Sequence, residues 1–316
     1  MTGLIIGCGN IGALYDLNDA EKVWTHAKAF SKTFGTDFVV TDANHSVAKK
    51  IAKKYNIEAV ELKKGFNFKN FDIVSITSPT PTHYEYLHIL LRQKVPVIIC
   101  EKPVAADSKE LNKLIKLYQK GESKILVNYM RRFQPAYDKL KKVITKQVNL
   151  SGCKGINIKY QRGFLNNGSH AFDLLEFLFD KPIALKNFIC RYAFFDAFSY
   201  DPTVSGSFTF DGCPVTTLGI EKVVYPIFEI ELFFHSMKIV ICHSGDEVRF
   251  YENEKGKELV ENQKIRQSNI LSQYMLPVLK KATQLFKNSE PDNFLQAVEL
   301  NKKIIHVISA IRKKDS

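Results

Sequence analysis

The chain has 316 residues, of which 45% are hydrophobic and 25% are charged. This length exceeds that of most single cores, so we expect two domains, and the balanced composition excludes a disordered or low-complexity protein. The apolar runs are well short of the roughly 18 residues that a membrane span needs. The first run begins at Leu4 and leads directly into a glycine loop. We therefore expect a cytoplasmic protein with no targeting peptide and no membrane contact.

The formal net charge of +12 raises the question of nucleic-acid binding. The lysines are spread along the chain and mostly alternate with apolar residues at helical spacing, which favours solvated helix faces over a nucleic-acid surface. A positive field would also favour an anionic substrate. The six cysteines are scattered without a CxxC pair, and His83 and His88 are at the wrong interval to share a metal. We therefore expect reduced thiols and no metal site.

Short apolar runs alternate with amphipathic segments over the N-terminal part of the chain. Runs that are apolar throughout are typical of strands covered by helices on both faces, so the pattern predicts a doubly wound parallel sheet. The expected strands are residues 4–6, 38–41, 72–77, 97–100 and 125–127, and the expected helices are residues 46–54, 84–92 and 111–118.

The pattern changes near Asn128, where long β-rich stretches replace the alternation of strand and helix. Such stretches suit an open, largely antiparallel sheet in an α+β domain. The boundary predicts one domain at residues 1–127 and a second at residues 128–316. In the second domain we expect strands within residues 205–221 and 227–243, and helices at residues 136–144, 271–286 and 293–311.

The first strand is followed by a glycine motif that opens a helix. In a strand–turn–helix context, the first glycine permits a tight turn, the second lets backbone approach a pyrophosphate, and the third allows close packing of helix on strand. The helix N-terminus then faces the phosphates. This motif predicts a dinucleotide site made by Gly7, Cys8, Gly9, Asn10, Ile11 and Gly12.

Asp42 closes the second expected strand. A carboxylate there can accept hydrogen bonds from both ribose hydroxyls and would repel a 2′-phosphate, which favours NAD over NADP. The interval of 30 residues from Gly12 is longer than the usual ~20. Residues 15–25 account for the surplus, and they form either a lid or a surface excursion.

Lys102 follows the fourth expected strand, in the triplet Glu101-Lys102-Pro103. A lysine at the carboxyl end of such a strand points toward the ligand crevice, and the proline fixes the turn that carries it. Its ammonium could stabilise negative charge on a reacting oxygen. A surface charge is the alternative for a lysine considered alone.

Three motifs together resemble the glucose-fructose oxidoreductase / inositol dehydrogenase (Gfo/Idh/MocA) family. They are the glycine motif, the Glu101-Lys102-Pro103 triplet, and the run from Gly163 through His170 to Leu175. Ser78-Pro79 with His83, and the stretch from Asn128 to Phe133, add to the resemblance. It implies a Rossmann domain followed by an α/β domain with an open, oligomer-forming sheet, and chemistry in the cleft between them. It also implies that the cofactor contacts include Thr77, Ser78, Pro79, His83, Glu101 and Lys102.

By this resemblance Lys102 and His170 fall on the family's catalytic lysine and histidine. The histidine would serve as general base in alcohol oxidation, a role that its near-neutral intrinsic pKa suits. Inositol dehydrogenase-like members often carry Asp four residues before the histidine, where this chain has Asn166. An amide can position a substrate hydroxyl but cannot act as a base. The other candidate substrate contacts are Asp173, Arg131 and Tyr129, and a salt bridge is the alternative for Arg131.

These observations predict an NAD-dependent oxidoreductase acting on a hydroxyl or keto group of a sugar, an amino sugar or a nucleotide sugar. Two alternatives stay open: a reductase of a non-sugar C=N or C=C bond, and a protein that senses dinucleotide without turnover. The apolar strand runs 215–220 and 228–234 exceed what one covered face requires, so we also expect a homodimer or homotetramer.

Overall fold

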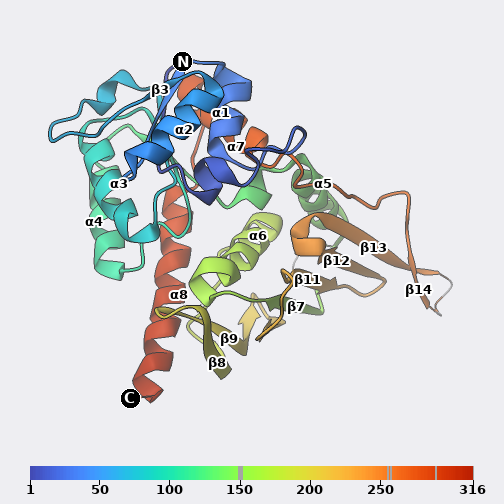
Figure 1. The fold of residues 1–316 in the computed structure, drawn as a ribbon. Coiled ribbons are helices and arrows are strands. Elements are labelled where there is room, and N and C mark those ends of the chain that lie inside the picture. Colours follow the sequence, from blue (N-terminus) through green and yellow to red (C-terminus); the bar gives the residue numbers. More distant parts are fainter. Residues whose placement is uncertain (149–151, 255, 257, 289, 316) are drawn as a thin grey trace. The chain divides into compact units, whose positions relative to one another are not determined.

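The computed structural model describes residues 1–148, 152–254, 256, 258–288 and 290–315 (Figure 1). The chain divides into two compact units. The first unit consists of residues 1–133 and 272–299, and the second of residues 134–271 and 300–316. The division differs from a boundary at Asn128 because residues 272–299 return to the first unit.

The returning segment contains α7 (Met275–Lys287), which packs against the sheet of the first unit. Its buried residues recur at helical spacing and form one apolar stripe. Figure 1 shows α7 beside α1 (His26–Phe34), a contact that joins segments far apart in the sequence. The stripe consists of Met275, Val278, Leu279, Ala282 and Leu285.

The first unit is built on a six-stranded sheet in the order β3-β2-β1-β4-β5-β6, in which every pairing is parallel. This is the doubly wound order in which ligands bind at the carboxyl ends of the strands. All five predicted strands are confirmed, and the two-residue β3 is an addition that was too short to predict. The strands are β1 (Gly3–Ile6), β2 (Phe38–Thr41), β3 (Glu58–Ala59), β4 (Ile73–Ile76), β5 (Val97–Cys100) and β6 (Lys124–Val127).

The connecting helices begin where polar side chains cap them. Thr25, Asn44 and Asp107 accept hydrogen bonds from backbone N–H groups in the first turn of α1, α2 and α4. The three helices predicted between the strands are confirmed as α2 (His45–Tyr55), α3 (His83–Arg92) and α4 (Ser108–Tyr118).

Side chains of the returning segment cover the edge strand β6. Ile125 N donates to Asp292 Oδ2 at 2.7 Å, and Val127 N donates to Asn293 Oδ1 at 2.8 Å. Asn293 Nδ2 in turn donates to Val127 O at 2.9 Å. These groups occupy hydrogen-bonding positions that a further strand would use, so they block edge-to-edge pairing.

The second unit contains an eight-stranded sheet in the order β14-β13-β12-β11-β7-β10-β9-β8. Only the pairing of β7 with β10 is parallel among those described, so the sheet is largely antiparallel as predicted. The strands are β7 (Gly155–Tyr160), β8 (Ile189–Phe198), β9 (Asp201–Phe210), β10 (Cys213–Gly219), β11 (Phe228–Phe233), β12 (Met237–Cys242), β13 (Glu247–Glu254) and β14 (Glu258–Glu261).

Three helices accompany this sheet. Helix α6 is buried along nearly its whole length and contributes to the apolar core, which also takes in one face of the strands. Helix α8 begins in the first unit and ends in the second. The helices are α5 (Pro135–Val143), α6 (Ser169–Phe179) and α8 (Phe294–Asp315).

The other face of the sheet is more polar than the apolar runs suggested. On β10 and β11 the apolar side chains alternate inward, and Thr216, Glu229 and Glu231 lie on the opposite face. Lys159 forms ion pairs with both glutamates on this face. Most apolar residues of these two strands therefore lie on the one covered face. Only the outward-facing Leu218 and Phe233 of these strands still support the expectation of an oligomer.

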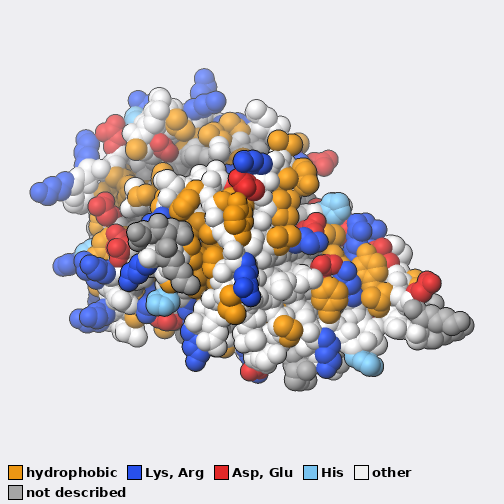
Figure 2. Space-filling view, turned by 90° about the horizontal axis from the view of Figure 1, so that it is seen from below, with side chains coloured by type: hydrophobic (Ala, Val, Ile, Leu, Met, Phe, Trp, Pro, Cys, Tyr) orange, Lys and Arg blue, Asp and Glu red, His pale blue; other side chains and the backbone are white. Residues whose placement is uncertain are grey.

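Basic side chains do not gather into one patch on the face drawn in Figure 2, where Lys and Arg are interspersed with acidic and apolar groups. Among the helices in the described ranges, none combines the length and apolar character required to cross a membrane.

Candidate functional site

A cavity of about 890 Å³ lies at the carboxyl ends of β1, β2 and β4 in the first unit. Its lining brings together most of the predicted cofactor residues, which come from three separate stretches of sequence. They are Gly7, Gly9, Asn10 and Ile11 of the glycine motif, Asp42 after β2, and Thr77, Ser78 and Pro79 after β4.

The three motif glycines meet different surroundings. Gly7 has φ of +102°, and a Cβ there would lie 2.7 Å from Ser78 N. At Gly12 a Cβ would lie 2.1 Å from Gly7 O and 2.9 Å from Thr77 Oγ1. At Gly9, by contrast, no described heavy atom lies within 4 Å of the position, which opens into the cavity. This is the position where a pyrophosphate can approach the backbone, so the cavity fits a dinucleotide.

Asp42 holds the glycine loop as well as lining the cavity. Cys8 N donates to Asp42 Oδ2 at 2.7 Å, and Asn44 N donates to Oδ1 at 2.8 Å. Each carboxylate oxygen has a second lone pair, so both can still accept from ribose hydroxyls. Burial, reinforced by the charge of Asp42, raises the pKa of the Cys8 thiol to about 12. Cys8 is therefore a neutral packing residue rather than a reactive thiolate.

Lys102 follows β5, which pairs with β4 in parallel register from Ile73↔Val97 to Ile76↔Cys100. Glu101 N donates to Ile76 O at 3.0 Å and continues this pairing by one residue. Lys102 therefore lies at the same edge of the sheet as the loop after β4, although it is not part of the cavity lining. Glu101 is also outside the lining and is buried.

His83, predicted to contact the cofactor, is buried and lies outside the cavity lining. Its Nδ1 lies 2.8 Å from Pro103 O and its Nε2 lies 2.8 Å from Ser78 O. Burial lowers the pKa of His83, and the two carbonyl contacts oppose that shift. The ring connects the turn that carries Lys102 to the loop that lines the cavity.

The run from Gly163 to His170 lies in the second unit, where a buried aspartate holds its first turn. Leu165 N and Asn166 N donate to the two oxygens of Asp201, at 2.8 and 2.7 Å. Gly163 has φ of +90°, and a Cβ there would lie 2.1 Å from Asp201 Oδ2. Gly163 is therefore required both by its backbone conformation and by the carboxylate beside it.

His170 lies in the first turn of α6, four residues after Asn166. Its ring is buried and packs edge-to-face on Phe228, with the centroids 6.4 Å apart. The Asn166 side chain donates to Arg162 O at 3.1 Å. Asp173, a further candidate, is buried on the same helix.

Tyr129 and Arg131 follow β6 in the first unit and are both buried. The neighbouring Arg132 donates through both terminal nitrogens to Gln296 Oε1, at 3.1 Å each. An amide of α8 in the same unit thus accepts hydrogen bonds from Arg132.

A family model described as an oxidoreductase family with an NAD-binding Rossmann fold (GFO_IDH_MocA) matches residues 1–129. These residues belong to the Gfo/Idh/MocA oxidoreductase family. The match includes the parallel sheet and the cavity, so the resemblance and an NAD-binding fold are confirmed for residues 1–129.

Inositol 2-dehydrogenase of Rhizobium meliloti (strain 1021) is 29% identical to the chain over 141 residues, which are 44% of this chain and 39% of that relative. The aligned chain thus spans about two fifths of the relative's length. Two solved structures have the same fold over nearly the whole chain. UDP-N-acetylglucosamine 3-dehydrogenase GnnA from Acidithiobacillus ferrooxidans has a TM-score of 0.73 at 15% identity and covers 98% of this chain and 97% of its own. The transcriptional regulator Gal80p from Kluyveromyces lactis has a TM-score of 0.72 at 14% identity and covers 99% and 90%.

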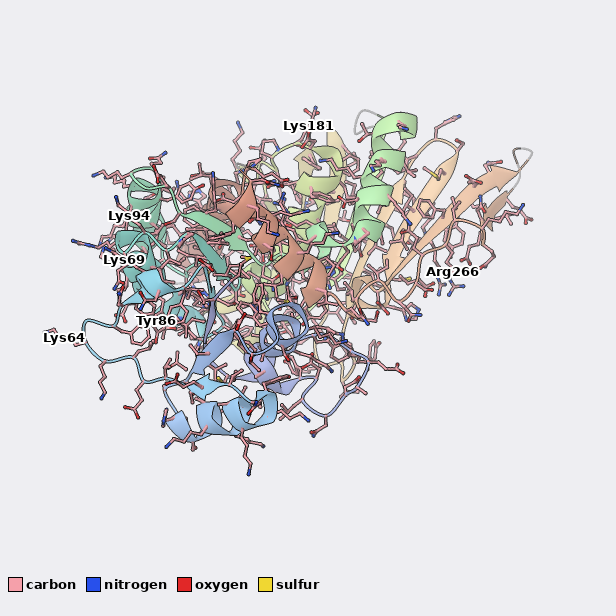
Figure 3. All side chains as sticks on the ribbon, turned by 90° about the horizontal axis from the view of Figure 1, so that it is seen from above. Lys64, Lys69, Tyr86, Lys94, Lys181 and Arg266 are labelled. Carbon is pink, nitrogen blue, oxygen red and sulfur yellow. The ribbon has the colours of Figure 1, made fainter. Side chains whose placement is uncertain are left out.

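The Gfo/Idh/MocA domain of this chain has cavity residues that the motifs did not reveal. Tyr86 of α3 lines the cavity together with His45, Glu61 and Leu62 from the β2 side. Figure 3 shows Tyr86 on the side of the unit that carries the loop with Lys64. An aromatic ring and an aliphatic side chain are the groups that a nucleobase packs against. Tyr86 and Leu62 are 24 positions apart in the sequence and belong to different segments of the unit, so no local pattern could have paired them.

Residues 15–25 form an excursion that is anchored at several points. Thr25 N and Thr25 Oγ1 donate to the carboxylate of Asp16, at 2.9 and 2.6 Å. Val23 N donates to Ser272 O, and Met275 N donates to Val23 O. These contacts favour a fixed surface excursion over a lid, and α1 begins directly after it at His26.

Cys242, His243 and Glu247 are the one group of metal-ligand type found among the described residues. Glu247 pairs with both Arg249 and Arg266, so its carboxylate is already neutralised. We assign this group to an ion-pair cluster.

Proposed function

We propose that the protein is an NAD-dependent oxidoreductase that transfers a hydride between the cofactor and a hydroxyl or keto group of a sugar, an amino sugar or a nucleotide sugar. The observation that carries this proposal is the shared sheet edge of the first unit. The dinucleotide cavity and Lys102 lie at the carboxyl ends of adjacent strands. Ligands bind at this edge in doubly wound sheets.

When bound, the nicotinamide supplies or accepts the hydride. Lys102 is the proposed donor of a hydrogen bond to the reacting oxygen, where it stabilises developing negative charge. His170 is the proposed general base in oxidation and general acid in reduction. The proposed substrate contacts are Asn166, Arg131, Tyr129 and Asp173.

The proposed substrate class is supported by the names of two similar proteins, one an inositol dehydrogenase and the other a UDP-N-acetylglucosamine dehydrogenase. A panel of inositols, free sugars and nucleotide sugars with NAD, followed by absorbance of the reduced cofactor, tests this class. We expect turnover with at least one member of the panel, and we expect Lys102→Ala to slow that turnover by about two to four orders of magnitude. If no member of the panel is turned over and compounds with a C=N or C=C bond are reduced instead, the protein is a reductase of a non-sugar substrate.

A non-catalytic dinucleotide sensor is the second candidate, because the same fold occurs in a transcriptional regulator. The proposed pair Lys102 and His170 favours turnover, since a sensor needs no proton-transfer groups. NAD binding without turnover of any panel member, unchanged by His170→Ala, would favour the sensor.

We also propose a cytoplasmic homodimer or homotetramer that binds neither nucleic acid nor membrane. Cell fractionation tests the location, and filter binding to mixed-sequence DNA and RNA tests the exclusion of nucleic acid.

A further inference from the structure

A chain of hydrogen bonds runs through the interior of the first unit next to Lys102. Ser75 Oγ lies 2.6 Å from His26 Nδ1, and His26 Nε2 lies 2.9 Å from Glu101 Oε1. Asn128 Nδ2 donates to the same carboxylate oxygen at 2.6 Å. His26 and Ser75 are completely buried, and Glu101 and Asn128 are nearly so. The chain joins α1, β4 and the ends of β5 and β6.

The hydrogen-bond partners of Glu101 are those of an ionised carboxylate. Burial acts to raise the pKa of Glu101, but the hydrogen bonds from His26 and Asn128, together with the charges of His26 and Lys102, outweigh it and the net pKa is lowered. An Nε2–H of His26 donates to Glu101, and the other ring nitrogen faces the Ser75 hydroxyl, which can donate or accept. Two donors on one oxygen therefore hold a buried anion in place.

A nearby anion favours the protonated form of Lys102, which is the form that donates hydrogen bonds. A lysine at a partly buried site loses its proton more easily because desolvation disfavours the ammonium, and a nearby anion reverses this tendency. Glu101 precedes Lys102 directly, and the charge of Lys102 is among the influences that favour the ionised Glu101.

We propose that His26 and Asn128 fix Glu101 as a buried anion that keeps the neighbouring Lys102 protonated as donor to the reacting oxygen. His26 and Glu101 are thus positioning residues. The segment of residues 15–25 contributes to this arrangement, because its anchored end at Thr25 fixes His26 at the start of α1. This inference rests on the proposed function for the role of Lys102.

The other ionisable groups near these hydrogen-bonded residues do not supply the negative charge that Glu101 supplies. Burial lowers the pKa of His83 of α3, and both of its ring nitrogens lie against backbone carbonyl oxygens. Tyr274, before α7, is neutral because burial raises its pKa, and the charges of Glu101, Asp16 and Tyr15 add to this shift while Arg131 opposes it. The carboxylate of Asp16 is engaged by the backbone and side chain of Thr25.

The test measures the titration of Lys102 itself. Trace acetylation with acetic anhydride across a pH series, followed by peptide mass spectrometry, gives the apparent pKa of each lysine. It is applied to the NAD-loaded full chain, wild type and Glu101→Gln. The amide keeps the shape and an acceptor oxygen but loses the charge, so we expect the pKa of Lys102 to fall by about 1 unit or more. Lys109 and Lys113 of α4 serve as internal controls and should titrate as before.

His26→Ala and His26→Gln extend the test to the positioning residue. We expect the pKa of Lys102 to fall less in His26→Ala than in Glu101→Gln. In His26→Gln it should return toward the wild-type value, because the glutamine amide can donate to Glu101 as the imidazole does. Melting temperature and NAD affinity show whether each variant is folded. An unchanged Lys102 pKa in a folded Glu101→Gln variant would overturn the inference.

The acetylation needs no substrate, so its outcome is independent of the proposed function. A shifted Lys102 with no turnover on any alcohol would remove the function and keep the inference. With a substrate in hand, Glu101→Gln should move the alkaline limb of the pH–kcat profile to lower pH with little change in KM.

Discussion

Gly9 and Gly12 differ in what a side chain would meet, and this difference separates binding from stability. Gly9→Ala places its methyl group in open cavity space. We expect its melting temperature to match wild type and its NAD affinity to fall at least tenfold, because the methyl group occupies the path of the pyrophosphate. Gly12→Ala drives Cβ into Gly7 O and should lower the melting temperature by several degrees. Differential scanning fluorimetry and calorimetric titration provide both readouts, and equal NAD affinity for wild type and Gly9→Ala would contradict this placement.

Asp42 should decide the choice between NAD and NADP. We expect wild type to bind NAD more tightly, because the carboxylate repels a 2′-phosphate. Asp42→Asn keeps an oxygen that can accept from Cys8 N and removes the charge, so it should reduce the difference in affinity between NAD and NADP without destabilising the glycine loop. Asp42→Ala should reduce this difference too, and it should also lower the stability of the protein. Calorimetric titration of both cofactors measures the effect, and an NADP affinity equal to that of NAD in wild type would remove this role.

The proposed catalytic residues should affect rate and leave cofactor affinity nearly unchanged. Replacing Lys102 or His170 by alanine should slow turnover by about two to four orders of magnitude. Oxidation by wild type should slow at acid pH as His170 takes up a proton, and His170→Ala should lose that limb. Asn166→Asp should move the limb to higher pH, because a carboxylate one turn away favours the imidazolium. Retention of more than about a tenth of the rate in His170→Ala would refute the assigned base.

The sequence could indicate those site residues whose role depends on their immediate neighbours. Gly7, Gly9 and Gly12 are recognisable because one turn imposes all their requirements. Tyr86 and His26 are not, because their partners are distant in sequence: Leu62 is 24 positions from Tyr86, and Ser75 is 49 positions from His26. His83 carried a motif signal, but its ring holds the backbone at Ser78 and Pro103 rather than lining the cavity.

At the scale of elements, the turn that leads into α6 depends on Asp201 of β9. Gly163→Ala combines a positive φ with a clash against that carboxylate, so we expect a loss of more than about 2 kcal/mol in unfolding free energy. Gly65→Ala is the matched control. Its φ is +84°, and within the described part of the chain no heavy atom lies within 4 Å of the added Cβ. It should cost about 1 kcal/mol, the backbone share alone. Equal losses in urea unfolding would contradict the clash.

Most elements were predictable because their signals are local and strong. The strands of the first sheet are continuous apolar runs, and α2 and α4 carry polar caps. The first helix was harder, because after the π-helical turn η1 (Asn10–Leu14) the excursion delays α1 until His26. The pairing of β7 with β10 joins strands that are distant in sequence, and no pattern within either strand specifies a parallel neighbour.

At the scale of the whole molecule, the outward face of the second sheet bears on assembly. We expect light scattering to show a homodimer or homotetramer at micromolar concentration. Leu218 is 51% exposed on this face, so Leu218→Arg should shift the distribution toward smaller species if the face is the interface. Leu259→Arg, on the edge strand β14, is the control and should not. A monomeric wild type would overturn the expectation.

The return of residues 272–299 to the first unit has a consequence for the order in which the protein is made. As the chain leaves the ribosome, residues 134–271 of the second unit must be synthesised before Asp292 and Asn293 can cover β6. During that interval β6 is an uncovered edge strand that can pair with a strand of another molecule. In a fragment that ends at Phe133, β6 would stay uncovered. We expect such a fragment to precipitate, and a fusion of residues 1–133 to residues 272–299 through a short linker to stay in solution.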